Sequence, residues 1–329
     1  MKIGIIGPGY MPIPPKGWGA IESLIWDYSE SLLNLGHEVY IYNSRDFEGV
    51  IEDINSKDLD FVHLQFDDYT PLMEHVKCPN KAVTSHYAYL EQPDKHGAYK
   101  QIFDHYAKID YHIFALSEGI KQTYIKELGV SPEKIKITPN GANSEMFLFS
   151  PECVKPDKSI CLAKIDPRKK QSFLQGKGLN IDFAGNQFDT EFDYESSDYL
   201  GEWEKTKVYE NLTDYANMVL LSDGEAHSLS CLEGLMSGLG LVISEQATAN
   251  LDLSLPFIDV INETQMQDSD YLREVIEKNR KSSLENRKEI REYAEKNFDW
   301  GVLVEKYEDT INEVINENEI DKYRSIGIK

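Results

Sequence analysis

Short apolar runs alternate with longer amphipathic segments through the first half of the chain. This alternation is typical of βα units that build a parallel sheet. A helix is predicted over 20–35, because Ile21, Leu24 and Tyr28 fall on one face and Gly36 follows as a residue suited to end it. The strands predicted from the apolar runs cover 3–7, 38–42, 60–64, 82–85, 111–116 and 135–138.

The pattern changes near residue 148, where Pro151 and Pro156 interrupt the periodicity. We place a domain boundary there and predict an N-terminal domain over 1–148 and a C-terminal domain over 149–300. The segment 188–215 is rich in Asp, Glu and Tyr, so it is predicted to be surface strand and loop outside the core. The strands predicted for the second domain cover 159–164, 181–184, 218–221, 239–244 and 257–261.

The segment 271–316 is highly charged and predicted to be largely helical. Its last helix begins at about residue 301 and carries Val302, Leu303, Tyr307 and Ile311 at helical spacing. One apolar face of this helix is therefore expected to pack against a domain.

Composition narrows the class of protein. A chain of 329 residues exceeds the usual size of one domain, which supports the two-domain division. The 57 acidic and 34 basic residues give a net charge of −23, which argues against sequence-independent binding of DNA or RNA. The basic run 168–170 is short, and fits either one small phosphorylated ligand or a solvated turn.

The four cysteines are scattered without metal-ligand spacing, so reduced thiols are expected. The sequence has no apolar stretch of the ~20 residues that a bilayer span needs. We therefore expect a soluble, cytoplasmic protein, with peripheral membrane contact left open.

The loop between the first strand and the first helix is rich in glycine. Gly7 and Gly9 begin a dinucleotide-type motif, but Pro12 takes the place of its third glycine, so a nicotinamide site is not favoured. Gly17 and Gly19 stand directly before the helix, where a missing Cβ allows either close approach of a ligand or the turn alone.

His86 follows a predicted strand at the edge where open α/β sheets bind ligands. It is a candidate for bonding a substrate hydroxyl or for proton transfer, or for a structural bond to backbone. His63, on the preceding strand, is expected to be structural.

The segment 222–238 holds Glu225 and Glu233 on either side of a predicted helix start at Ser228. The free N–H groups and the positive dipole end of that helix favour a phosphate, whereas two carboxylates suit uncharged hydroxyls. A sugar nucleotide offers both.

Several motifs together resemble the retaining glycosyltransferases of family 4 (GT4), which are similar to glycogen synthases and mannosyltransferases. These motifs are the Glu225-x7-Glu233 element, the run 161–171, Thr138-Pro-Asn-Gly, the glycine loop 14–22, Thr84-Ser-His86 and Phe298-Asp-Trp300. The resemblance runs the full length of the chain. It implies the GT-B fold, an α/β architecture of two Rossmann-like parallel-sheet domains that face each other across a cleft, with the helix of about 301–329 closing the N-terminal, acceptor-binding domain.

The resemblance also implies a function and its residues. A sugar passes from a nucleoside diphosphate donor, most simply a UDP- or GDP-sugar, to an acceptor hydroxyl on a glycan or small molecule, with no metal or other cofactor. His86 and Glu225 are then the catalytic residues. The donor-binding residues are Gly17, Gly19, Lys164, Lys169, Ser228, Leu229, Ser230 and Glu233. Among these, Lys164 and Lys169 hold the diphosphate, Glu225 the sugar hydroxyls and Glu233 the ribose.

Three departures from the family pattern keep other functions open. Lys164 stands where the family has arginine, and Ala226-His227-Ser228 replaces its glycine-aromatic-glycine, which puts His227 where a sugar would lie. The segment 164–185 is also shorter than in the family. The alternatives are a sugar-nucleotide-binding protein without transfer activity and a GT-B epimerase.

Overall fold

The computed structural model describes residues 1–325 as two compact units. The first unit contains Met1–Pro15, Gly19–Asn140 and the helix from Trp300 onward; the second contains Lys16–Trp18 and Gly141–Asp299. Residues 326–329, which belong to the predicted closing helix, lie outside the described residues. Each unit is built around one parallel sheet, so the α/β class with two parallel-sheet domains is confirmed.

The sheet of the first unit has six parallel strands in the order β2-β1-β3-β4-β5-β6. Each strand lies where a strand is predicted. Their bounds are β1 (Lys2–Ile6), β2 (Glu38–Tyr42), β3 (Phe61–Leu64), β4 (Lys81–Val83), β5 (His112–Ala115) and β6 (Ile135–Ile137). The strand order reverses between β1 and β3.

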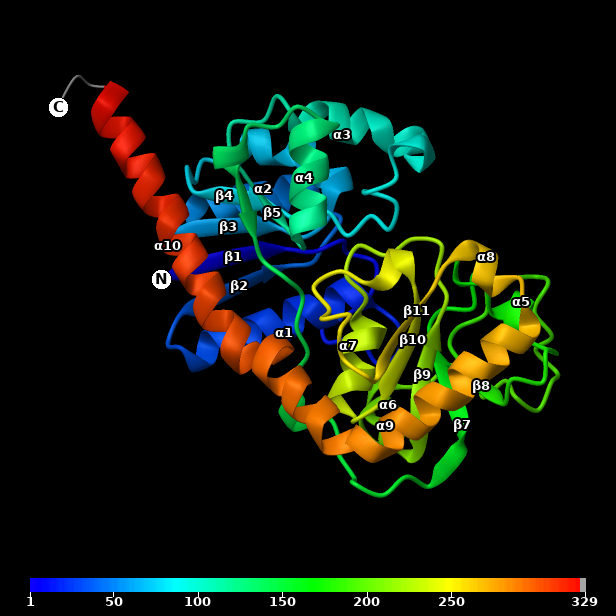
Figure 1. The fold of residues 1–329 in the computed structure, drawn as a ribbon. Helices are drawn as coiled ribbons and strands as arrows, with labels where there is room; N and C mark the ends of the chain where they lie inside the picture. Colours follow the sequence, from blue (N-terminus) through cyan, green and yellow to red (C-terminus); the bar gives the residue numbers. More distant parts are fainter. Residues whose placement is uncertain (326–329) are drawn as a thin grey trace. The chain divides into compact units, whose positions relative to one another are not determined.

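Helices flank this sheet. Their bounds are α1 (Ala20–Asn34), α2 (Phe47–Ser56), α3 (Lys100–Tyr106), α4 (Glu118–Lys126) and α10 (Trp300–Ser325). The predicted helix over 20–35 is confirmed by α1. The first turns of α10 lie beside α1 (Figure 1), where the rings of Trp300 and Tyr307 stand 4.3 and 4.7 Å from the ring of Tyr28.

The sheet of the second unit has five parallel strands in the order β11-β10-β9-β7-β8. Their bounds are β7 (Lys155–Leu162), β8 (Ile181–Ala184), β9 (Tyr215–Leu220), β10 (Gly240–Ser244) and β11 (Ile258–Ile261). All five predicted strands are present, but β7 begins four residues before the predicted start at 159. Pro156 fits within β7 because the pairing with β9 is irregular between Lys155 and Ser159, where no ladder N–H is needed.

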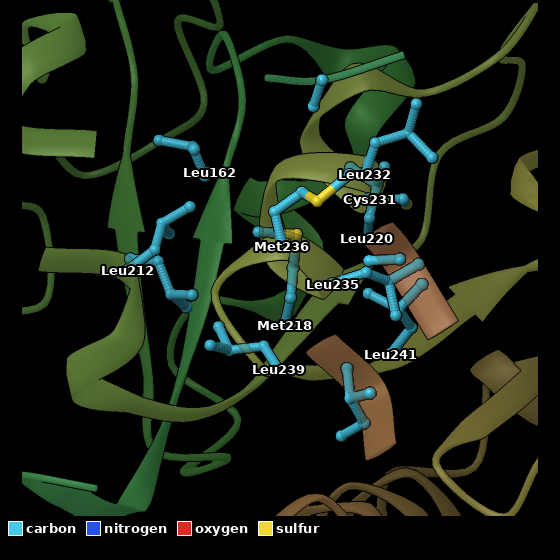
Figure 2. Packing of buried hydrophobic residues seen from close by; sticks show 14 of the residues in the cluster. Leu162, Leu212, Met218, Leu220, Cys231, Leu232, Leu235, Met236, Leu239 and Leu241 are labelled. Atoms are coloured by element: carbon cyan, nitrogen blue, oxygen red, sulfur yellow. The ribbon is translucent and has the colours of Figure 1, made fainter. Parts of the chain in front are cut away.

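The helices of the second unit are α5 (Gln171–Leu174), α6 (Lys205–Asn211), α7 (Leu229–Met236), α8 (Glu263–Met266) and α9 (Ser269–Phe298). Figure 2 shows buried side chains of β9, β10 and α7 gathered in one cluster. A Cβ built on Gly234 of α7 would lie 3.1 Å from the Cε and Sδ atoms of Met218 on β9. Because glycine has no Cβ, α7 can pack this closely against the sheet.

The prediction that 188–215 lies outside the core is wrong. Phe192, Trp203, Val208 and Leu212 are all buried within the two hydrophobic clusters of this unit. The acidic composition of the segment hides them in the sequence, because each is an apolar side chain in a stretch rich in polar residues. A segment of this kind contributes to the core through a few anchors without a periodic pattern.

The two sheets share one topology, with a reversal of strand order between their first and third strands in chain order. Open α/β sheets bind ligands outside the carboxyl ends of the strands at such a reversal. The candidate positions are therefore the segments after β1 and β3 in the first unit and after β7 and β9 in the second. Among residues 1–325, no helix combines the length and apolar character needed to cross a bilayer.

Candidate functional site

The segments that follow β7 and β9 carry most of the predicted donor-binding residues. Lys164 and Lys169 follow β7, whereas Glu225 and Ser228 follow β9. Because β7 and β9 are parallel neighbours, both segments leave the sheet at the same edge. The predicted site thus falls at the strand-order reversal of the second unit.

Glu225 is the centre of a charged cluster in this unit. Its Oε1 atom accepts hydrogen bonds from Lys169 Nζ at 2.6 Å and from Arg168 Nη1 at 3.3 Å. Burial by itself raises the pKa of Glu225, but the charges of Lys169 and Arg168 outweigh burial, and the net pKa is lowered. Glu225 is therefore ionised at neutral pH, and the predicted residues Glu225 and Lys169 are in direct contact.

Arg168 fixes the loop that carries Glu225. Its Nη1 atom also donates to the carbonyl oxygen of Gly224 and lies 3.4 Å from Ser222 Oγ. Its own carbonyl oxygen accepts from the N–H of Asp223 at 2.7 Å. In the sequence, Arg168 stands out only as part of a basic run, although its guanidinium, with several donors, makes it the residue of that run best suited to hold a loop.

Helix α7 begins as predicted. Ser228 is its N-cap, and Ser228 Oγ accepts from the N–H of Cys231 at 3.5 Å. Leu229 and Ser230 form the first turn and are half-buried. The N–H groups of a first helical turn have no partner within the helix, and they carry the positive end of its dipole. This end of α7 is thus suited to an anion.

Glu233, on α7, is also paired with a cation. Its Oε1 atom lies 2.7 Å from Nζ of Lys205, the first residue of α6, and Glu233 is only 8% exposed. Nothing in the sequence pointed to Lys205, because it lies 28 residues from Glu233 in a segment predicted to be surface loop. Both candidate carboxylates, Glu225 and Glu233, therefore form ion pairs with lysines.

Lys164 has different partners from Lys169. Its Nζ atom stands 3.6 Å from the centre of the Phe188 ring and 4.0 Å from Asp166 Oδ2. The Phe188 ring is 61% exposed, so this cation–π contact lies at the surface. The role of Lys164 beside Lys169 on a diphosphate stays a prediction.

His227 does not present its ring as an open group. The residue is 6% exposed, its ring lies 6.1 Å from that of Phe298, and its Nε2 atom is 3.4 Å from Asn250 Nδ2. His227, which stands where the GT4 pattern has an aromatic residue, is therefore packed into the second unit.

The two candidate glycines have different local roles. A Cβ on Gly17 would lie 2.3 Å from Glu202 Oε1, which also accepts from the N–H of Trp18 at 3.2 Å. Gly19 has φ of 135° and precedes the first residue of α1, a backbone conformation that other residues rarely adopt. The turn accounts for Gly19, and close approach of a carboxylate accounts for Gly17. Ligand binding by either stays a prediction.

His86 lies in the first unit, after β4. Its Nε2 atom is 2.9 Å from Oε1 of Gln65, which follows β3. Burial lowers the pKa of His86 to about 4, so its ring is neutral at physiological pH. Gln65 was not identified from the sequence; its position directly after β3, at the strand-order reversal, was the available signal.

No family model matches this chain, and no curated protein matches it. Several solved structures are similar to this chain. HepE of Anabaena, in complex with UDP and glucose, is 13% identical, with 95% of this chain and 100% of that chain covered and a TM-score of 0.71. Sucrose-phosphate synthase of Thermosynechococcus elongatus is 13% identical over 96% of this chain and 99% of that chain, with a TM-score of 0.76.

AviGT4, a glycosyltransferase of avilamycin A biosynthesis, is 14% identical over 96% of this chain and 98% of that chain, with a TM-score of 0.69. At such low identities the likeness concerns the fold alone. It extends over both units, because 95–96% of this chain is covered. This chain therefore has the GT-B fold.

Proposed function

We propose that this protein is a glycosyltransferase that moves a sugar from a nucleoside diphosphate sugar to an acceptor hydroxyl on a glycan or small molecule. The observation that carries the proposal is the contact of Lys169 and Arg168 with Glu225 at the strand-order reversal of the second unit, where the segment after β9 leads into α7. This arrangement offers cations and helix N–H groups to a diphosphate and a carboxylate to hydroxyls. A structure of HepE that shares this fold contains UDP-glucose, which supports a UDP-sugar as the first donor to test.

The cations suggest how the leaving group is stabilised. A nucleoside diphosphate gains negative charge as the glycosidic bond breaks, and fixed positive groups lower the energy of that state. Lys169, with the first turn of α7 at Leu229 and Ser230, would supply this stabilisation. Within residues 1–325 no group of three or more His, Cys, Asp or Glu is placed to hold a metal ion. We propose a reaction that needs no metal and no other cofactor.

The proposed reaction is a front-face transfer with retention, as in family GT4. The acceptor oxygen forms a bond to the anomeric carbon on the face from which the diphosphate leaves. The bond from that carbon to the phosphate oxygen breaks, and the leaving phosphate takes the acceptor proton. Glu225 and His86 bind sugar hydroxyls in this scheme, Glu233 binds the ribose, and Lys164 joins Lys169 on the diphosphate.

A thermal-shift screen against UDP, GDP, ADP and their common sugar conjugates tests the binding step. One class of nucleotide should raise the midpoint of unfolding, because a ligand that binds only the folded state stabilises it. An active enzyme should then slowly release nucleotide from the matching sugar conjugate. Stabilisation without release would indicate a binding protein, and a new nucleotide sugar without acceptor would indicate an epimerase. If no nucleotide stabilises the protein, the proposal is wrong.

The role of Glu225 is tested by Glu225→Gln with Glu245→Gln, an exposed carboxylate of the same unit, as the control. We expect kcat to fall by about a hundredfold or more for Glu225→Gln, since the loss of a charged hydrogen bond in the transition state costs roughly 3 kcal/mol. Unchanged turnover would remove Glu225 from the mechanism. The anomeric configuration of the product, read by NMR, tests retention, and turnover in excess EDTA tests independence from metal.

We also propose that the protein is located in the cytoplasm. All four cysteines are free thiols, two of them buried, which fits a reducing compartment such as the cytoplasm.

A further inference from the structure

A chain of hydrogen bonds leads inward from His86 in the first unit. His86 Nε2 lies 2.9 Å from Gln65 Oε1, and Gln65 Nε2 lies 3.1 Å from His63 Nδ1. The other nitrogen of that ring, His63 Nε2, lies 2.8 Å from Thr84 Oγ1. The hydroxyl of Tyr307 lies 2.7 Å from His63 Nδ1.

The direction of these bonds follows from their inner end. The Thr84 hydroxyl donates its single proton to the carbonyl oxygen of Phe114 at 3.1 Å. Thr84 Oγ1 can therefore only accept from His63, so the proton of the His63 ring resides on Nε2. A neutral imidazole carries one N–H, which leaves His63 Nδ1 as an acceptor.

The outer bonds are then determined as well. His63 Nδ1 then offers one lone pair, which the Tyr307 hydroxyl and the Gln65 NH₂ group share as donors. Gln65 faces this nitrogen with its NH₂ group because its amide oxygen would be repelled by the lone pair. Gln65 then presents its amide oxygen to His86, and this oxygen can only accept. His86 must donate from Nε2, which leaves its Nδ1 atom without a proton.

Burial keeps these rings neutral. His63 is fully buried, and Gln65 and Thr84 are each 1% exposed. Burial, with a smaller contribution from the charge of His86, lowers the pKa of His63 to about 3. Neither ring therefore carries a second proton at physiological pH. Each ring has one N–H donor and one acceptor nitrogen, as the assignment of the bonds above requires.

We propose that Thr84, His63 and Gln65 are positioning residues that fix His86 as the Nε2–H tautomer, so that its Nδ1 atom accepts a hydrogen bond from a substrate hydroxyl. We call these three residues and His86 the histidine relay. The inference rests on the proposed function for the identity of the ligand, but the tautomer itself is a property of the free protein. His63, which the sequence assigns only to structure, thereby sets the chemical form of a catalytic candidate.

The test is a ¹H–¹⁵N correlation spectrum of the full chain labelled at histidine nitrogen, recorded without nucleotide. We expect the His86 ring, assigned by loss of its signals in His86→Gln, to show a protonated Nε2 and an unprotonated Nδ1. In Thr84→Val, His63 loses the acceptor that fixes its proton, so the relay can reverse and His86 should show a mixture of both tautomers. Ser29→Ala is the matched control, because it removes an equally buried hydroxyl that bonds within α1. It should leave the His86 signals unchanged.

Gln65→Met provides a second variant that does not disturb the bond between His63 and Thr84. It should also give mixed tautomers of His86, and it should lower kcat with little change in the KM for the donor. A wild-type His86 with its proton on Nδ1, or a single unchanged tautomer in both variants, would overturn the relay. Failure of every nucleotide to bind would instead contradict the proposed function and leave these spectra as they are.

Discussion

At the scale of single residues, charge pairing decides which candidates can act together. Lys169 and Lys170 are neighbours, yet Lys169 bonds Glu225, whereas Lys170 lies 3.6 Å from Asp223. The pairing places Lys169 within the predicted donor site and gives Lys170 a separate acidic partner. The two side chains therefore form a matched pair for mutation.

We expect Lys169→Met to weaken binding of the nucleoside diphosphate found in the thermal-shift screen by about tenfold to a hundredfold. A hydrogen bond between charged groups contributes roughly 1.5–3 kcal/mol, which corresponds to that range. Isothermal titration measures the effect, and Lys170→Met should change the dissociation constant less than threefold. Equal losses in the two variants would show that only the general positive charge matters.

A second residue-scale prediction concerns Asp67, a buried carboxylate that accepts a hydrogen bond from the Ser85 hydroxyl. Burial raises its pKa from 3.8 to about 6, although the Ser85 bond opposes this shift. The folded state thus holds the Asp67 proton more tightly than the unfolded state does. The contribution of Asp67 to stability is greatest below pH 4 and falls as pH rises from about 4 to 6.

Asp67→Asn should therefore raise the free energy of unfolding at pH 7.5 by up to about 3 kcal/mol, the value of two pKa units, and should bring no gain at pH 4. Urea unfolding at the two pH values measures this difference. Asp68→Asn, at the exposed neighbouring position, is the control and should have little effect at either pH. A gain of the same size at pH 4 would mean that charge burial is not its cause.

At the scale of elements, helix α7 combines a structural cap with a predicted ligand site. Ser228→Ala removes the hydroxyl that accepts from Cys231 N, and it should cost about 0.5–1 kcal/mol of stability, as is usual for an N-cap. Ser117→Ala is the control, because Ser117 caps α4 in the first unit by accepting from the N–H of Ile120 at 3.1 Å.

Both cap variants should lower the melting temperature, but only Ser228→Ala should weaken nucleotide binding. Melting curves with and without the nucleotide separate the two effects. If Ser117→Ala weakens binding to the same extent, the loss reflects overall stability and not the first turn of α7.

The elements themselves were largely predictable from the sequence. Within residues 1–325, the eleven strands and α1 lie where apolar runs or one-sided spacing predict them. Most of these parallel strands, such as β3, β9 and β10, are buried on both faces and are therefore apolar. The start of α7 was predictable because a serine cap has a local signal. The buried anchors Phe192 and Trp203 were not, since an isolated aromatic residue in an acidic loop has no periodicity.

The site was only partly predictable. The contact between Glu225 and Lys169 joins two motifs that both stand out in the sequence. The roles of three further residues, Arg168, Lys205 and Gln65, could not be assigned from the sequence. The partners of Arg168 and Lys205 lie 57 and 28 residues away on other segments, and Gln65 acquires its role through its bond to His86. Pairings of this kind depend on tertiary structure.

At the scale of the whole molecule, the net charge of −23 has a measurable effect. Like charges repel one another in the compact state, and salt screens them with a Debye length of about 10 Å at 0.1 M. We expect the melting temperature to rise by several degrees between about 10 mM and 500 mM NaCl. Potassium chloride should act in the same way as sodium chloride, and a melting temperature that falls with salt would show that attractive ion pairs dominate.

The packing of α10 on α1 affects the order in which the two units fold during synthesis on the ribosome. Trp300 and Tyr307 pack on Tyr28 of α1, and Tyr307 also bonds His63, yet all of Gly141–Asp299 is translated between α1 and α10. The second unit can thus fold while the first still exposes the apolar surface around Tyr28. The N-terminal unit should be the later of the two to mature, and it should be the one that chaperones bind on the growing chain.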